Sequence, residues 1–178
     1  MADEVTALSA EPVPLRQRQL VDWSAAVWAG VLAGAVLFLL DVLVLPLLIG
    51  GNGWVMVRLL ASPVLGETIL APPATFDATA LGVALLSHFA LSIAFACLLA
   101  FIFHRGGLIT GILGGALFGM ALYGIQIYTM TFLFPWFFAL HGWPFFTAHV
   151  VFGALAGGIY EGLEVEEFVP VAAEPEGA

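Results

Sequence analysis

Four strongly polar residues interrupt the apolar stretches of this chain and are the residues best suited to do chemistry. They are Asp41, His88, Gln126 and His149, one in each of four long apolar segments. An isolated Asp at the centre of a bilayer costs roughly 2.5–3.5 kcal/mol on insertion scales, so such groups need partners. All four lie at a similar depth, roughly 9–15 Å below one predicted membrane face at about 1.5 Å per residue. We therefore expect one shared polar centre inside a helix bundle.

Three roles are open for this polar centre. Hydrogen bonds between helices would lock the bundle, at about 0.6 kcal/mol per bond on average in one membrane protein. A proton or solute pathway is the second role, because ionisable residues inside membranes often mark such routes. The third is a cofactor site, in which His88 and His149 bind a metal ion with a carboxylate or ligate haem iron. The sequence contains no HxxxH, ExxH or CxxCH motif, so no cofactor is predicted.

The elements that must position these residues follow from hydropathy. Of 178 residues, 62% are hydrophobic and only 10% are charged, whereas a soluble domain is nearer half apolar and a quarter charged. We predict an all-α polytopic membrane protein with a four-transmembrane-helix bundle over residues 21–163. Its spans are expected at about 23–49, 78–103, 108–133 and 143–163. The segment 54–60 is too short to span and is expected at the interface.

The first span and the turn after the second raise two further expectations. The first apolar run exceeds the roughly 7–15 residues of a signal-peptide core, so we expect an uncleaved anchor. The second and third spans are joined by the short turn His104-Arg105-Gly106-Gly107. This turn predicts that the two spans are antiparallel neighbours.

The segments outside the spans are polar. Residues 1–20 are predicted to be a disordered N-terminal tail and residues 164–178 an acidic, disordered C-terminal tail. The net charge is −9 and lysine is absent, which excludes nucleic-acid binding because that needs a basic face. The single Cys97 allows no internal disulfide and no CxxC metal site.

Arginine positions predict the orientation in the membrane. With four spans the two termini share a side, and Arg16, Arg18 and Arg105 fall on that side against Arg58 alone on the other. The positive-inside rule then places both termini in the cytoplasm.

Small residues recur at four-residue intervals, which keeps them on one helix face. Glycines on such a face let helix backbones approach closely within lipid. The series comprises Gly30, Gly34, Gly107, Gly111, Gly115, Gly119, Gly153 and Gly157. Two interpretations are open: packing inside the bundle, or a homo-oligomer or partner seam on the third span.

The order of features resembles small bacterial four-span inner-membrane proteins of the YagU-like kind, whose function is uncharacterised. The resemblance rests on SHFALSIAFA at 87–96, FPWF at 134–137 and AHVVFGALAGGIY at 148–160, and it covers roughly residues 25–162. It implies four helices and a bacterial inner (plasma) membrane location. It supplies no catalytic residues.

The leading functional prediction is a non-enzymatic accessory or structural subunit of a larger membrane complex, whose polar cluster locks the bundle. Its partners would be the lipid bilayer and other membrane subunits or further copies of the chain. The alternative is a homo-oligomeric channel or proton-coupled transporter using Asp41, His88 and His149. A haem- or metal-binding redox module is third.

Overall fold

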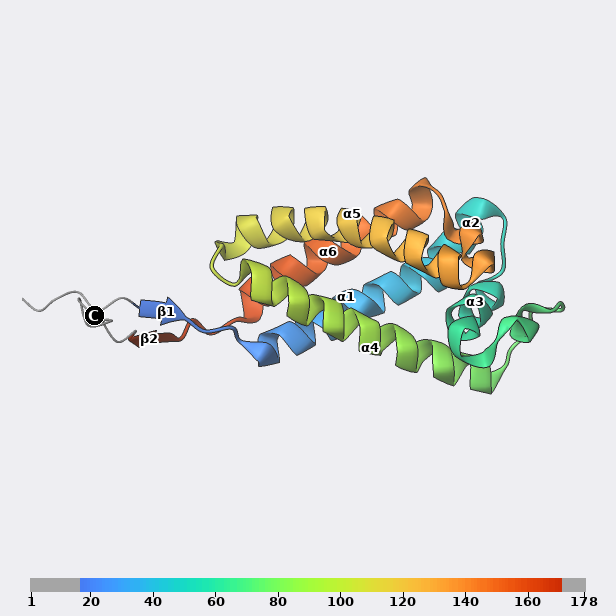
Figure 1. Ribbon diagram of the computed structural model, residues 1–178, viewed down its shortest axis with the longest axis horizontal. Coiled ribbons are helices and arrows are strands. Elements are labelled where there is room, and N and C mark those ends of the chain that lie inside the picture. Colours follow the sequence, from blue (N-terminus) through green and yellow to red (C-terminus); the bar gives the residue numbers. More distant parts are fainter. Residues whose placement is uncertain (1–16, 171–178) are drawn as a thin grey trace, which may run out of the picture.

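The protein is an all-α membrane bundle, described by a computed structural model over residues 17–170 (Figure 1). Within that range, four helices are long and apolar enough to cross a membrane, so the predicted four-helix bundle is confirmed and the chain is a multi-pass integral membrane protein. The first spanning helix consists of α1 (Trp23–Leu39), the π-helical turn η1 (Leu40–Val44) and α2 (Leu45–Ile49). The other three are α4 (Ala78–Phe103), α5 (Gly107–Leu133) and α6 (Trp143–Leu163).

Shorter elements connect the spans at the end of the bundle that holds α2. These are α3 (Gly53–Leu65), η2 (Glu67–Leu70) and η3 (Pro135–Leu140). The Arg58 guanidinium on α3 donates hydrogen bonds to the carbonyls of Ile69, Ala71 and Thr75, at 3.2–3.3 Å. Arg58 thereby fixes the loop between α3 and α4. The predicted interfacial segment 54–60 is thus part of a longer helix that packs on the bundle.

The helices pair unequally. The closest packing joins α5 to α6, and α1 packs against both α4 and α6. In contrast, α4 and α5 meet near their connecting turn and separate toward the end that carries α3 (Figure 1). The turn at 104–107 therefore makes these spans antiparallel as expected, and they are neighbours only near this turn.

Glycines on α5 and α6 pack face to face. A Cβ on Gly115 or Gly119 would clash with the backbone carbonyl of Gly153 or His149, and a Cβ on Gly157 would clash with that of Gly111. Because glycine has no side chain, the two helix backbones can approach this closely.

A second glycine contact joins α1 to α4. A Cβ on Gly30 would lie 2.6 Å from Ile93 Cα, and one on Gly34 would lie 2.7 Å from Ser92 Cβ. Together with the α5–α6 contact, this places seven of the eight predicted seam glycines inside the bundle. Gly107 differs, because it begins α5 at φ +72° and an added Cβ there would meet no atom within 4 Å.

The first spanning helix is interrupted in its C-terminal third. Leu45 N–H donates to the carbonyl of Leu40, five residues back, and Pro46 follows directly. Proline has no N–H for the carbonyl of Val42, four residues earlier, and its ring crowds that carbonyl. Gly53 packs directly against this carbonyl group, and a Cβ at Gly53 would lie 2.5 Å from the Val42 oxygen. The widened turn that results contains Asp41.

Two short strands join the segments that flank the membrane domain. The strand β1 (Gln17–Gln19) pairs antiparallel with β2 (Phe168–Pro170). Asp22 caps α1 by accepting a hydrogen bond from Ala25 N–H at 3.0 Å, and it also accepts one from Val165 N–H at 3.1 Å. The structure thus differs from the predicted disorder at 17–19 and 168–170. The parts of the predicted tails at 1–16 and 171–178 lie outside the described residues.

Candidate functional site: a polar cavity inside the bundle

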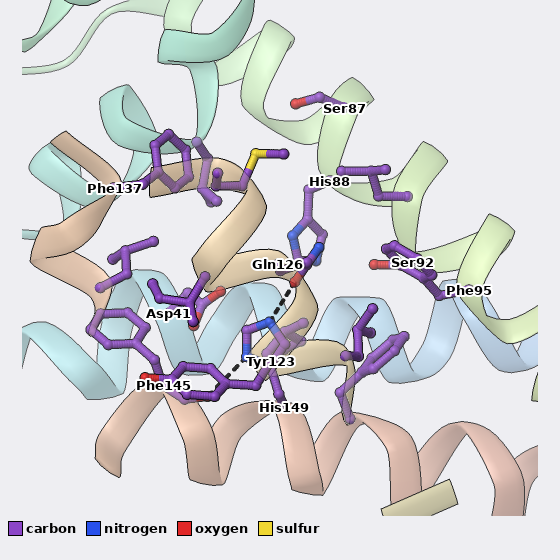
Figure 2. A pocket seen from close by; sticks show the side chains of 18 of the residues that line it. Asp41, Ser87, His88, Ser92, Phe95, Tyr123, Gln126, Phe137, Phe145 and His149 are labelled. Atoms are coloured by element: carbon purple, nitrogen blue, oxygen red, sulfur yellow. Dashed lines mark hydrogen bonds between the residues drawn. The ribbon is translucent and has the colours of Figure 1, made fainter. Parts of the chain in front are cut away.

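A cavity of about 260 Å³ lies between the four spanning helices. All four predicted polar residues, Asp41, His88, Gln126 and His149, line it (Figure 2). The structure therefore brings together the residues that the sequence predicts to share a polar centre. Most of the remaining wall is apolar and rich in aromatic rings.

Asp41 is the least satisfied of these groups. Its side chain is 6% exposed, and Oδ1 is buried without a hydrogen-bond partner among residues 17–170. A buried acceptor without a donor costs about 1–3 kcal/mol, and more when the group is charged. The π-helical turn that carries Asp41 is a type of helix defect found frequently at functional sites.

His149 and Gln126 form the one direct side-chain pair of the cluster. His149 Nε2 lies 2.7 Å from Gln126 Oε1, and Nδ1 lies 2.8 Å from the Phe145 carbonyl oxygen. Because a carbonyl oxygen can only accept a hydrogen bond, Nδ1 must carry a proton. A neutral imidazole then needs the Gln126 amide turned so that its NH₂ group donates to Nε2, whereas an imidazolium donates to both oxygens. Both arrangements tie α6 to α5.

His88 connects α4 to α1. Its Nε2 lies 2.8 Å from the Gly34 carbonyl oxygen, so Nε2 carries the proton. The ring is held edge-on between Phe38 and Phe89, with centroid distances of 5.3 and 5.5 Å. Nδ1 then remains an acceptor without a hydrogen bond to the described residues.

A metal or haem site at His88 and His149, the third of the roles open for the polar centre, is not supported by this arrangement. Among residues 17–170, no three His, Cys, Asp or Glu side chains converge as metal ligands. His149 uses both nitrogens in hydrogen bonds, and His88 uses Nε2 to bind a backbone carbonyl. Each histidine is therefore oriented toward its own partner helix and not toward a shared ion.

The roof of the cavity was not foreseen from the sequence. It consists of α3, through Met56, Leu60 and Pro63, and of η3, through Phe137, together with Phe134 directly before η3. Trp136 on η3 donates from Nε1 to Ser62 Oγ on α3, at 2.8 Å, which joins the two roof elements. The spacing of Met56, Leu60 and Pro63, four and then three residues apart, is a one-face helical pattern that could have indicated this role.

The cavity opens sideways. Leu91 on α4 is the most exposed of its lining residues, at 49%, and Met130 on α5 is half-buried, whereas Asp41 on η1 and Phe145 on α6 are buried. These two helices are also the ones that diverge along their length (Figure 1). The lateral opening, defined here as the gap beside Leu91 and Met130, thus faces the lipid side of the bundle.

Comparison with known proteins adds no relative: no family model, curated protein or solved structure matches this chain. The resemblance to YagU-like proteins therefore stays a prediction.

Proposed function

We propose that this protein is a non-enzymatic, proton-coupled carrier that binds a small molecule in its polar cavity. Asp41 is the group that exchanges a proton, and His88 and His149 shape the binding site. One observation carries the proposal: Asp41, whose buried Oδ1 has no hydrogen-bond donor among residues 17–170, lines a cavity at a break in a spanning helix. Ionisable residues that face a cavity inside a membrane commonly mark proton relays and substrate pathways.

A purely structural role accounts less well for this cluster. Polar groups that only lock a bundle stabilise it when all of them are hydrogen-bonded, and a partly satisfied network is costly. His149 and Gln126 meet that condition, but Asp41 does not. The accessory-subunit interpretation has no comparable observation in its favour, and it stays a prediction.

The architecture also supports a single-bundle carrier over a homo-oligomeric channel. The cavity lies within one chain, and the small-residue faces that would have served an oligomer pack internally. Carriers typically bind substrate beside interrupted helices, as at the π-helical turn here. At the opposite end, Ala25, Ala26, Ala29 and Ala100 pack tightly with the fully buried Tyr160, so transport requires this end to open.

The proposed setting is the bacterial inner membrane, with both termini in the cytoplasm. This orientation rests on Arg16, Arg18 and Arg105, which share the side of the termini. The cavity then lies in the outer half of the bilayer, and the packed alanine end faces the cytoplasm.

Proton movement in liposomes tests the proposal. The liposomes contain a trapped pH-sensitive dye and are made from lipids of the membranes that supply the protein, so that a membrane-derived substrate is present. After an acid step, wild-type protein should admit protons faster than protein-free liposomes, and Asp41→Asn should return the rate to that background. Asp77→Asn is the matched control, because Asp77 caps α4 outside the spans and Asn caps equally well. Equal rates for the wild type and Asp41→Asn would rule out the carrier.

A further inference from the structure

We infer that the ligand of the polar cavity is a lipophilic molecule with a hydrogen-bond-donating head, either a hydroxyl or an ammonium group, and that it enters from the bilayer between α4 and α5. The inference deepens the proposed function, since it names the class of molecule that the carrier binds. It stands on three features: the acceptor on Asp41, the apolar wall and the lateral opening.

The acceptor on Asp41 defines the head of the ligand. Oδ1 is enclosed and has no donor among the described residues, while the neighbouring His149 and Gln126 already satisfy each other. A ligand oxygen that only accepts would leave Oδ1 unpaired, whereas an O–H or N⁺–H would pair with it. The His88 Nδ1 acceptor has the same preference for a donor.

The wall of the cavity defines the body of the ligand. Beyond the polar cluster it presents aromatic rings from four elements, and such rings favour edge-on or offset contact with another ring. A volume of about 260 Å³ equals that of about nine water molecules at roughly 30 Å³ each. One substituted ring fits this volume, and a longer tail would extend through the lateral opening.

The opening defines the route of entry. Leu91 and Met130 border it on helices that separate along their length; Leu91 is exposed and Met130 is half-buried. Along the bundle axis, α3 and η3 cover the cavity and are joined by the Trp136–Ser62 hydrogen bond. A molecule already dissolved in lipid therefore reaches Asp41 without crossing this roof.

Binding of three matched probes to the full chain in nanodiscs tests the head group. The probes are 4-butylphenol, its methyl ether 4-butylanisole, and the 4-butylbenzylammonium ion, and binding is followed by tryptophan fluorescence against empty nanodiscs. The two donors should bind about tenfold more tightly than the ether, as expected for a hydrogen bond to a carboxylate. Asp41→Leu should abolish this preference. Asp41→Asn should keep the phenol preference and lose that for the cation, because its amide oxygen still accepts.

Two leucines on α4 test the route. Leu91→Trp should slow phenol association by about tenfold or more, because the larger ring fills the opening. Leu98→Trp is the matched control: Leu98 is 47% exposed and seven residues further along the same face, away from the cavity. Equal association rates for the two variants would overturn lateral entry.

The two sets of experiments can overturn the ligand class and the carrier function independently. If the ether bound as tightly as the phenol while Asp41-dependent proton movement persisted, the ligand class would be wrong and the carrier would stand. If donor preference required Asp41 but no proton flux appeared, the cavity would be a binding site without transport.

Discussion

The two ends of the bundle are built on opposite principles. The end near the strand pair is closed by alanines packed around the fully buried Tyr160, and the glycine contacts between α5 and α6 run from this end toward the cavity. The other end holds a cavity and an interrupted helix, and Asp41 Oδ1 faces that cavity without a donor among residues 17–170. Dispersion contacts and close backbone approach stabilise helix pairs in lipid, so the first end supplies stability. The second retains polar groups at an energetic cost, which is typical of a functional site.

The glycine contact should show the largest effect on stability. Gly115→Leu places a side chain against the carbonyl of Gly153 on α6, and a clash with backbone cannot be relieved by a rotamer change. We expect the α5–α6 pair to separate and the bundle to unfold, with a loss above the 1–3 kcal/mol typical of overpacking. Thermal unfolding in mild detergent measures the effect.

Gly124→Leu provides the control on the same helix, because a Cβ there would meet no atom within 4 Å. It should unfold close to the wild-type temperature. If Gly115→Leu instead kept the monomer fold and changed only the native mass, the glycine face would belong to an oligomer and the contrast between the two ends would fail.

Asp41→Leu should change stability in the opposite direction and raise the free energy of unfolding. Leu approximates the shape of Asp and removes a buried acceptor that no described residue satisfies. Replacing such a group by an apolar one is often neutral or stabilising, so we expect a gain of about 1–3 kcal/mol in unfolding free energy together with the loss of the preference for donor probes over the ether. Chemical or thermal unfolding in detergent checks the sign. A marked loss of stability would show that Asp41 is structural and would erase the difference between the ends.

The sequence predicts the spans and the membership of the polar cluster because both depend on local periodicity. Asp41, His149 and the glycines share helix faces at spacings of four and seven residues, so helical geometry alone places them inward. The lateral opening depends on how far α4 and α5 diverge, which neither helix encodes by itself. The π-helical turn was also missed, although Pro46 four residues after Val42 is the signal for it. The strand pair was missed because three residues in a polar tail carry too little pattern.

The His149–Gln126 pair should have a smaller effect than either change above. Gln126→Leu leaves His149 Nε2 without its 2.7 Å partner and should lower stability by about 1–2 kcal/mol. His149→Phe removes both the ring nitrogens and the need for the amide. A double-mutant cycle should therefore give a coupling of about 0.5–1.5 kcal/mol. Zero coupling would mean that the cavity end is held by packing alone, and that its polar groups serve only the ligand.

The smallest effect is expected at the strand-bearing end, where Asp22 joins α1 to the segment after α6. Hydrogen bonds from the backbone N–H groups of Ala25 and then Val165 lower the pKa of Asp22 below its usual value of 3.8. A carboxylate with a lowered pKa in the folded state stabilises that state above the unfolded pKa, near 4, and this contribution is lost as the pH falls through the folded pKa. Thermal unfolding should therefore show wild type losing stability relative to Asp22→Asn only below about pH 4. Because Asp22 is largely solvated the difference is small, and a difference that grew at neutral pH would show that the strand pair is held by something other than this cap.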